Sequence, residues 1–350
     1  MMEQALLWLK FLTASGLVVV AGLSLTRNAE RLAEAFGWGH AFAGFMILGC
    51  ATSLPELTIS LSAVTAVGSP TLATGNITGS VIFNLGILAL LDLLARRRTV
   101  RDGGQVAGLA PLGLFNLALL GGMTAISFRP QLFAGNLAAF PAGLLLAGYL
   151  GATFQGWWTE RRGGADGAAP SALPHPADVL PGEQPGPVGT AAALLRCLVA
   201  AVVILSAGIW LSHLGDQVAQ VYGLSQGFVG RLFLAVTSSL PELVTGLAAV
   251  RLGLHVMAAG SILGSNVFNL GILGACDLVY QAGAPTGLHL LLAAHQTEPF
   301  AAAWSWMAAL SMTLLLLAAR WWQHRGGGSH PPALTAWAAL ALYVFALVEV

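Results

Sequence analysis

The sequence predicts an all-α membrane protein of ten transmembrane helices, built as two inverted five-helix repeats with proline-broken helices 2 and 7 at the centre. Of its 350 residues, 56% are hydrophobic and 9% are charged, whereas roughly a quarter of the residues in a soluble globular domain are charged. Apolar stretches of about the 20 residues that a helix needs to cross the hydrocarbon core recur along the chain. An internal repeat is the third observation.

The repeat lies near the start of each half. Its first copy reads TSLPE over 52–56 and GSVIFN over 79–84, and its second reads SSLPE over 238–242 and GSNVFN over 264–269. Residues 75–88 and 260–273 are identical at ten of fourteen positions. A repeat of this kind implies two structural halves built alike.

Hydropathy places five spans in each half, between turn and charge signals. The expected spans are Gln4–Leu25, Gly37–Val67, Ser69–Ala95, Gln105–Phe128, Leu132–Trp157, Thr190–His213, Leu224–Val250, His255–Tyr280, Pro299–Trp322 and Ala333–Val350. We therefore assign residues 1–158 to the first repeat, with its motif at 49–88, and residues 190–350 to the second, with its motif at 235–273. The short apolar segment Ala284–Glu298 is interpreted as an interfacial or re-entrant piece.

Residues 159–189 are predicted to be a flexible cytoplasmic linker, because Gly163–Gly189 contains six Gly and six Pro and cannot bury a core. Ten spans with an outside N-terminus place twelve of the 15 basic residues on the inside. The positive-inside rule then puts both termini outside. A second five-span half must enter from the opposite face, so the repeats are inverted. The twelve are Arg27, Arg31, Arg96, Arg97, Arg98, Arg101, Arg161, Arg162, Arg196, Arg251, Arg320 and Arg325.

Each half carries one glutamate, Glu56 or Glu242, near the middle of an apolar span. A charge at that depth is expensive and normally has a partner. Arg231 precedes Glu242 by eleven residues, about 16 Å along a helix at 1.5 Å per residue, so neither span supplies a cation. The unpaired acids therefore predict that the partner is a mobile cation.

The proline before each glutamate removes a backbone donor and frees carbonyl groups one turn back. Exposed backbone at this depth is tolerated where it lines a cavity. Two hydroxyl side chains precede the proline on each broken span. The next span of each half carries a serine and an asparagine, which are spaced i, i+4 and therefore face one side of a helix. This all-oxygen set suits Ca²⁺ or several Na⁺ better than a soft transition metal. Its members are Thr52, Ser53, Ser80, Asn84, Ser238, Ser239, Ser265 and Asn269.

The two motifs resemble the alpha-repeats of the Ca²⁺/cation antiporter superfamily, most closely those of its Na⁺/Ca²⁺ exchanger branch. The resemblance implies that the two glutamates and the eight polar residues are ion ligands, joined by backbone carbonyls near Gly49 and Ala235. It also implies that Gln4–Leu25 and Thr190–His213 slide to alternate access. Val81 departs from the pattern, where asparagine often follows the Gly-Ser pair.

The function predicted is therefore exchange of Ca²⁺ for Na⁺ by alternating access at a midplane two-glutamate site. Exchange of Ca²⁺ or another divalent cation for H⁺ on the same carboxylates is the alternative. We expect a bacterial or archaeal inner membrane, no enzymatic activity, no cofactor, no nucleic acid and no protein partner. An intramembrane hydrolase, a structural scaffold and a channel remain as rivals; a channel differs by a flux that needs no counter-ion.

Overall fold

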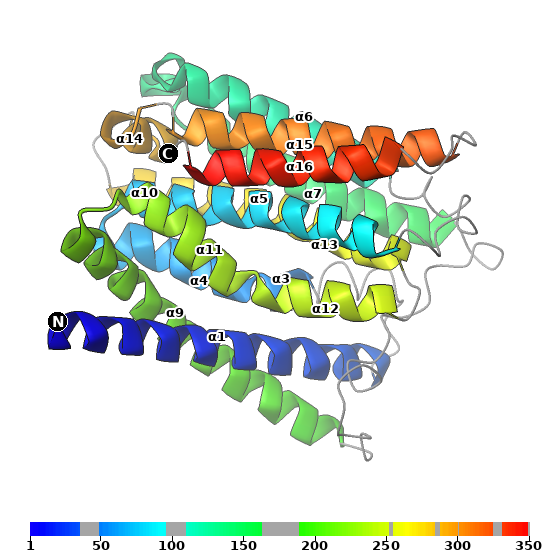
Figure 1. Cartoon of the computed structure of the whole chain (residues 1–350), viewed down its shortest axis with the longest axis horizontal. Coiled ribbons are helices and arrows are strands. Elements are labelled where there is room, and N and C mark those ends of the chain that lie inside the picture. The colour runs from blue at the N-terminus through cyan, green and yellow to red at the C-terminus, as the bar shows by residue number, and fades with distance from the viewer. Residues whose placement is uncertain are drawn as a thin grey trace.

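The computed structural model describes residues 1–35, 49–95, 110–162, 189–251, 255–283, 288–299, 301–324 and 331–348, and these fold into helices without strands. Figure 1 shows the helices running side by side across the molecule. In chain order they are α1 (Met2–Ala35), α3 (Gly49–Thr52), α4 (Leu54–Ser62), η2 (Ala63–Val67), α5 (Pro70–Ala95), α6 (Ala110–Phe128), η5 (Pro130–Phe133), η6 (Gly135–Leu137), α7 (Phe140–Arg162), α9 (Thr190–Tyr222), α10 (Gln226–Val229), η7 (Gly230–Leu234), α11 (Ala235–Ser238), α12 (Leu240–Arg251), α13 (His255–Gly283), α14 (Leu290–Thr297), α15 (Ala301–His324) and α16 (Pro331–Val348).

Among the described residues, six helices are long and apolar enough to cross a membrane, or seven if the bent pair 226–238 and 240–251 forms one span. Shorter apolar helices occupy Leu54–Val67, Leu112–Phe128 and Leu334–Ala346. Each of the ten expected spans contains helix, but the count of ten spans stays a prediction. The linker 163–188 and the start of the second expected span lie outside the described residues.

Several boundaries differ from those expected. Helix α1 continues ten residues past Leu25, and α9 runs past His213 to Tyr222, because hydropathy marks only the apolar part of a helix that extends beyond it. The span expected from Leu132 corresponds to a candidate span at Gly135–Gln155; residues 130–137 form two 3₁₀ turns, and α7 itself begins at Phe140. Gly135 adopts φ +64° there, a conformation that glycine accepts without a Cβ penalty.

Helices α1 and α9 pack against each other as an antiparallel pair along one side of the molecule (Figure 1). Near the start of α1, Trp8 Nε1 donates to the Tyr222 hydroxyl at the end of α9 over 2.8 Å. Further along α1, Leu25 belongs to a buried cluster with Ile204, which lies in the first half of α9. The long helices that open the two halves of the chain therefore run in opposite directions.

The two broken helices share one break geometry. Ser53, between α3 and α4, has φ −95° and ψ 9°, and Ser239, between α11 and α12, has the same values. The axis bends by 47° at the second break. In each case the proline two residues later lacks the N–H that would continue the helical bonds, so the repeated sequence produces a repeated kink.

Helices α5 and α13, which carry the second part of each motif, cross at the centre and pack crosswise on the closing helices of opposite halves. Phe83 and Gly86 of α5 contact Tyr343 of α16. Phe268 and Gly271 of α13 contact Tyr149 of α7 in the matching way. The two halves therefore interlock about the same pair of positions in each motif.

Glycines allow α5 to approach the second broken helix closely. A Cβ at Gly75 would meet the backbone of Gly227, and one at Gly79 would meet the backbone of Arg231. The segment expected to be interfacial contains the eight-residue helix α14, which is not among the candidate spans. Asp277 Oδ1 accepts from the Leu290 N–H at its start.

Candidate cation-binding site

The two glutamates lie together at the centre of the molecule. Glu56 and Glu242 are 0% and 2% exposed, and their side chains are close enough for the two charges to interact. Each begins the helix that follows a break, Glu56 on α4 and Glu242 on α12. The paired acids that the sequence repeat predicts therefore converge.

Glu56 is held by hydroxyl groups from the opposite half. Ser239 Oγ donates to Glu56 Oε1 over 2.8 Å, and the Ser238 side chain also hydrogen-bonds this carboxylate. Ser238 in turn lies 3.4 Å from Ser80 on α5, oxygen to oxygen. Glu56 Oε2 is buried without a hydrogen-bond partner and is free to meet a cation.

Glu242 has a matching environment. Ser265 Oγ on α13 donates to Glu242 Oε1 over 3.2 Å, and the Thr52 side chain from the first half also hydrogen-bonds this carboxylate. Ser53 Oγ lies 3.1 Å from Ser265 Oγ. Glu242 Oε2 is again buried without a partner. Each carboxylate thus has one oxygen held by hydroxyls and one left over.

The two predicted asparagines are fully buried but differ in their contacts. Asn84 Nδ2 donates to Asn266 Oδ1 over 3.1 Å and lies 3.5 Å from Ser265 Oγ, while its Oδ1 has no partner. Neither polar atom of the Asn269 side chain has a hydrogen-bond partner. Asn84 therefore belongs to the polar network, and Asn269 supplies two unsatisfied atoms one turn beyond Ser265.

The two backbone positions taken from the family resemblance lie at the same place in their motifs. Gly49 is the first residue of α3 and Ala235 the first of α11. The Ala235 carbonyl accepts from the Ser239 N–H at 3.0 Å and from the Ser238 hydroxyl at 3.2 Å. In this conformation Ala235 is engaged within its own helix, so its part in ion binding stays a prediction.

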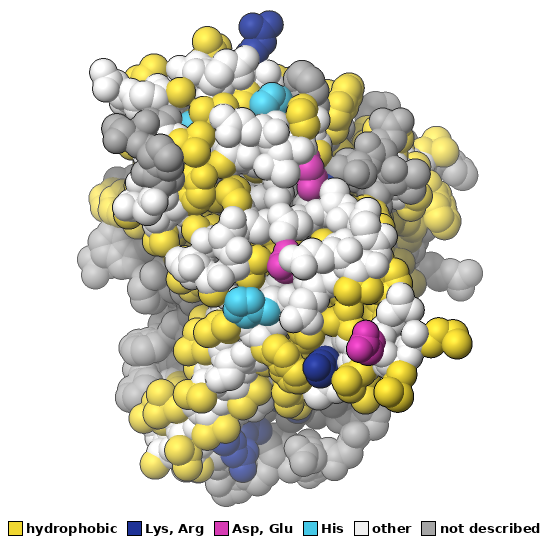
Figure 2. All heavy atoms as spheres, turned by 90° about the vertical axis from the view of Figure 1, so that its left-hand side faces the viewer, with side chains coloured by type: hydrophobic (Ala, Val, Ile, Leu, Met, Phe, Trp, Pro, Cys, Tyr) yellow, Lys and Arg dark blue, Asp and Glu magenta, His cyan; other side chains and the backbone are white. Residues whose placement is uncertain are grey.

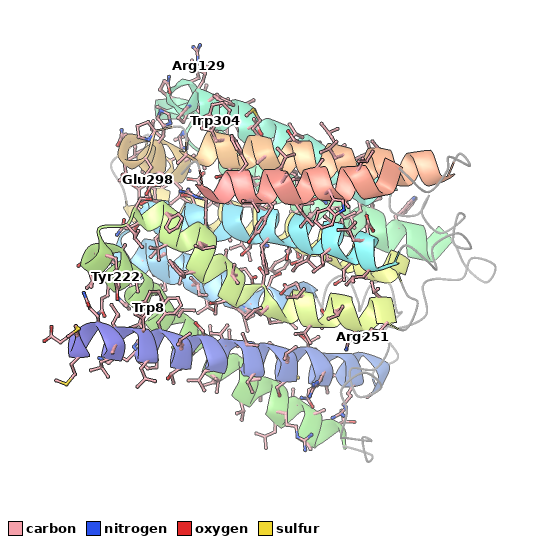
Figure 3. All side chains as sticks on the ribbon, viewed as in Figure 1. Trp8, Arg129, Tyr222, Arg251, Glu298 and Trp304 are labelled. Carbon is pink, nitrogen blue, oxygen red and sulfur yellow. The ribbon has the colours of Figure 1, made fainter. Side chains whose placement is uncertain are left out.

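Among the described residues, no basic side chain forms an ion pair with either glutamate. Arg231, which lies on the same broken helix as Glu242, pairs instead with Glu298, at 3.5 Å between Nη2 and Oε2. Figure 3 labels Glu298 at the end of the molecule opposite Arg251. Glu298 also accepts from the Gly227 N–H at 2.8 Å. Because Arg231 forms this ion pair, it provides no counter-charge for the two glutamates.

Sequence reasoning missed two neighbours of the site. Asn266, to which the motif assigns no role, joins α13 to α5 through the Asn84 amide and the Val81 carbonyl. Asn76 Nδ2 donates to Ser60 Oγ over 2.9 Å, one turn along from Glu56. The i, i+4 spacing from Asn76 to Ser80 was a usable signal, whereas the contact between Asn266 and Asn84 depends on how α5 crosses α13.

The chemistry of this centre is that of a site for a hard cation. Its donors are carboxylate, hydroxyl and amide oxygens, which Ca²⁺ and Na⁺ prefer. Within the described part of the chain, no three His, Cys, Asp or Glu side chains come together, so the site lacks the His and Cys ligands typical of softer metals. Two buried carboxylates without basic partners need a positive charge from outside the protein.

Comparison with known proteins identifies a family and a bacterial relative. A family model described as "Sodium/calcium exchanger protein" matches residues 6–157 and 192–349. The inner membrane protein YrbG of Escherichia coli is 28% identical over 269 residues, covering 75% of this chain and 78% of that protein.

Two solved structures share the fold. The H⁺/Ca²⁺ exchanger CAX has a TM-score of 0.64 at 18% identity, with 98% of this chain and 88% of that one covered. The sodium-calcium exchanger NCX_Mj has a TM-score of 0.59 at 20% identity, with 99% of each chain covered.

Proposed function

Because the chain belongs to the sodium/calcium exchanger protein family, we propose that it is a secondary active antiporter that exchanges Ca²⁺ for Na⁺ across the membrane. It is an integral membrane protein, and its family is one of exchangers, not of enzymes. The observation that carries the proposal is the convergence of Glu56 and Glu242 in one buried oxygen-lined centre.

The proposed ligands are the two glutamates and the hydroxyl and amide groups around them, with backbone carbonyls at Gly49 and Ala235. Contacts between the halves support this set, because Ser239 reaches Glu56 and Ser53 reaches Ser265. A cation bound there would contact both halves at once, so its binding would depend on how the two halves are placed relative to each other. The full set is Thr52, Ser53, Glu56, Ser80, Asn84, Ser238, Ser239, Glu242, Ser265 and Asn269, with Gly49 and Ala235.

The proposed architecture has ten spans in two inverted repeats, 1–158 and 190–350. The antiparallel α1 and α9, the identical breaks at Ser53 and Ser239 and the crosswise tyrosine contacts support it. In Figure 1, α1 begins on the side where α16 ends, as a topology with both termini outside requires. On that face, Figure 2 shows the described Lys and Arg side chains at scattered positions, which fits an outer surface.

The proposed mechanism follows from charge. An empty site holds two uncompensated carboxylates, and exposing them to an apolar gate is expensive. A bound Ca²⁺, or bound Na⁺ ions, makes the site nearly neutral, so only loaded forms switch. The pair α1 and α9 is proposed to slide during the switch. Its contacts suit sliding, because Gly22 of α1 lies against Pro241 and Gly208 of α9 lies against Thr58.

Exchange of Ca²⁺ for H⁺ is the second candidate. The likeness in fold to an H⁺/Ca²⁺ exchanger favours it, and a proton on Glu56 or Glu242 would neutralise the site as a cation does. Na⁺ and H⁺ can each neutralise the two carboxylates and so allow the switch. A transport measurement must therefore distinguish Na⁺ coupling from H⁺ coupling.

The test is uptake of ⁴⁵Ca²⁺ into vesicles that contain the purified full-length protein. Vesicles loaded with Na⁺ and diluted into Na⁺-free buffer should accumulate Ca²⁺, whereas an imposed pH gradient at equal Na⁺ should not drive uptake. The Glu56→Gln variant controls for leak. Uptake driven only by the pH gradient would replace Na⁺ coupling by H⁺ coupling, and uptake without any counter-ion would indicate a channel.

A further inference from the structure

We infer that Asn266 is a positioning residue, which fixes the Asn84 side-chain amide so that its carbonyl oxygen is the end offered to the transported cation. The inference rests on the proposed cation-binding function. Asn266 lies on α13 and Asn84 on α5, and both are fully buried. Asn266 is not one of the proposed ligands; its effect on the cation is exerted through Asn84.

The orientation of both amides can be traced to a backbone carbonyl. Asn266 lies 3.4 Å from the Val81 carbonyl oxygen, and a carbonyl can only accept a hydrogen bond. The Asn266 nitrogen must therefore face Val81, which turns the Asn266 oxygen toward Asn84. At 3.1 Å that oxygen requires the nitrogen of Asn84 as its donor. The Asn84 oxygen is then the end that remains.

The unpaired oxygen of Asn84 destabilises the fold unless a ligand binds to it. Asn84 Oδ1 is buried without a hydrogen-bond partner, and leaving a buried acceptor unsatisfied destabilises a fold. It belongs to a side chain next to Ser265, whose hydroxyl donates to Glu242. A cation held by Glu242 would satisfy the oxygen, and an amide already turned this way loses no rotational freedom on binding.

The corresponding asparagine of the second half, Asn269, has no orienting partner of this kind among the described residues. Asn269 occupies the motif position of Asn84, and Val81 occupies that of Asn266. A valine side chain has no donor or acceptor, and both polar atoms of Asn269 are buried without partners. Asn84 is therefore a preset ligand, while the Asn269 amide turns its oxygen to a cation only when one arrives. The two ends of the site therefore differ in preorganisation, although each offers an asparagine at this position.

The test compares Ca²⁺ binding and transport in the full-length protein and three variants. Calorimetric titration of Ca²⁺ in detergent gives the dissociation constant without a gradient, and vesicle uptake gives KM and Vmax. Asn266→Val copies the first half into the second and should weaken Ca²⁺ binding about tenfold, mainly through KM. Asn84→Ala should have a similar effect. In the Asn84→Ala background, Asn266→Val should add less than about twofold, because coupled residues are not additive.

Two outcomes overturn the inference. One is wild-type affinity in Asn266→Val; the other is full additivity of the two substitutions, which would mean that Asn266 acts apart from Asn84. If Asn266→Val does not fold, Val81→Asn provides the reciprocal test, and it should tighten Ca²⁺ binding because it gives Asn269 a partner. An unchanged or weaker affinity in Val81→Asn counts against the inference. Absence of Ca²⁺ binding in the wild type would instead refute the proposed function.

Discussion

The two broken helices share their geometry but differ in what surrounds them. Both turn at a serine with the same backbone angles, and both place a glutamate one turn later against a hydroxyl. Around the second break, however, lie a buried Arg231, paired with Glu298, and the orienting Asn266. The corresponding residues in the first half are Phe45, outside the described residues, and Val81.

This difference separates two kinds of requirement. The proposed cation ligands occur twice, because a cation held between the halves would need charge from both. Features that anchor a helix or orient an amide occur once: Arg231 pairs with Glu298, and Asn266 contacts Asn84. Around the first break, Ser60 and Asn76 are joined by a hydrogen bond, and their counterparts Gly246 and Ser261 are smaller. The repeat is thus closely kept among the proposed side-chain ligands, where only Thr52 and Ser238 differ, and less closely kept away from them.

The largest effect is expected when either repeated acid is neutralised. Glu56→Gln and Glu242→Gln each leave a single carboxylate, so that a bound Ca²⁺ carries an uncompensated charge in a buried site. An intramembrane charge costs about 3 kcal/mol even on lenient scales, which is on the order of 100-fold in affinity. ⁴⁵Ca²⁺ uptake should fall by that factor or more in both variants. A variant that retained uptake would show that only one half supplies the essential charge.

A smaller difference is expected between the two serines at the breaks. Ser239 donates directly to the Glu56 carboxylate at 2.8 Å, whereas Ser53 contacts the hydroxyl of Ser265. Hydrogen bonds to charged groups contribute about 1.5–3 kcal/mol, and neutral ones about 0.5–1.5. Ser239→Ala should therefore raise the KM for Ca²⁺ tenfold or more on this scale, and Ser53→Ala by only a few-fold. Equal effects would indicate that both hydroxyls act as direct ligands of the ion.

Much of this comparison follows from the repeated motif. Proline before a buried glutamate predicts the kinks, and the matched positions predict that Glu56 and Glu242 meet. The sequence cannot give the register in which α5 crosses α13, so the contact of Asn266 with Asn84 is not visible in it. Nor does it show that Arg231 is paired with Glu298, because α14 lies far along the chain. Hydropathy also understates α1 and α9, whose helices continue beyond their apolar parts.

The smallest effect is expected at the paired glycines that face the tyrosines. A Cβ at Gly271 would lie 3.0 Å from Tyr149 Cγ, while one at Gly86 would lie 3.5 Å from Tyr343 Cγ. The first distance requires the ring to shift, and the second is an ordinary contact. Gly271→Ala should therefore destabilise the protein by about 1 kcal/mol, seen as a lower Tm in detergent, and Gly86→Ala should be neutral.

Gly143→Ala is the matched control for this pair, because a Cβ at Gly143 of α7 would meet nothing within 4 Å. Its Tm should equal that of Gly86→Ala. The KM for Ca²⁺ should stay unchanged in Gly86→Ala, since Tyr343 touches none of the proposed ligands through a hydrogen bond. An equal loss of stability in Gly86→Ala and Gly271→Ala would mean that the two closing helices pack alike, and that the halves differ less in their outer packing than these distances indicate.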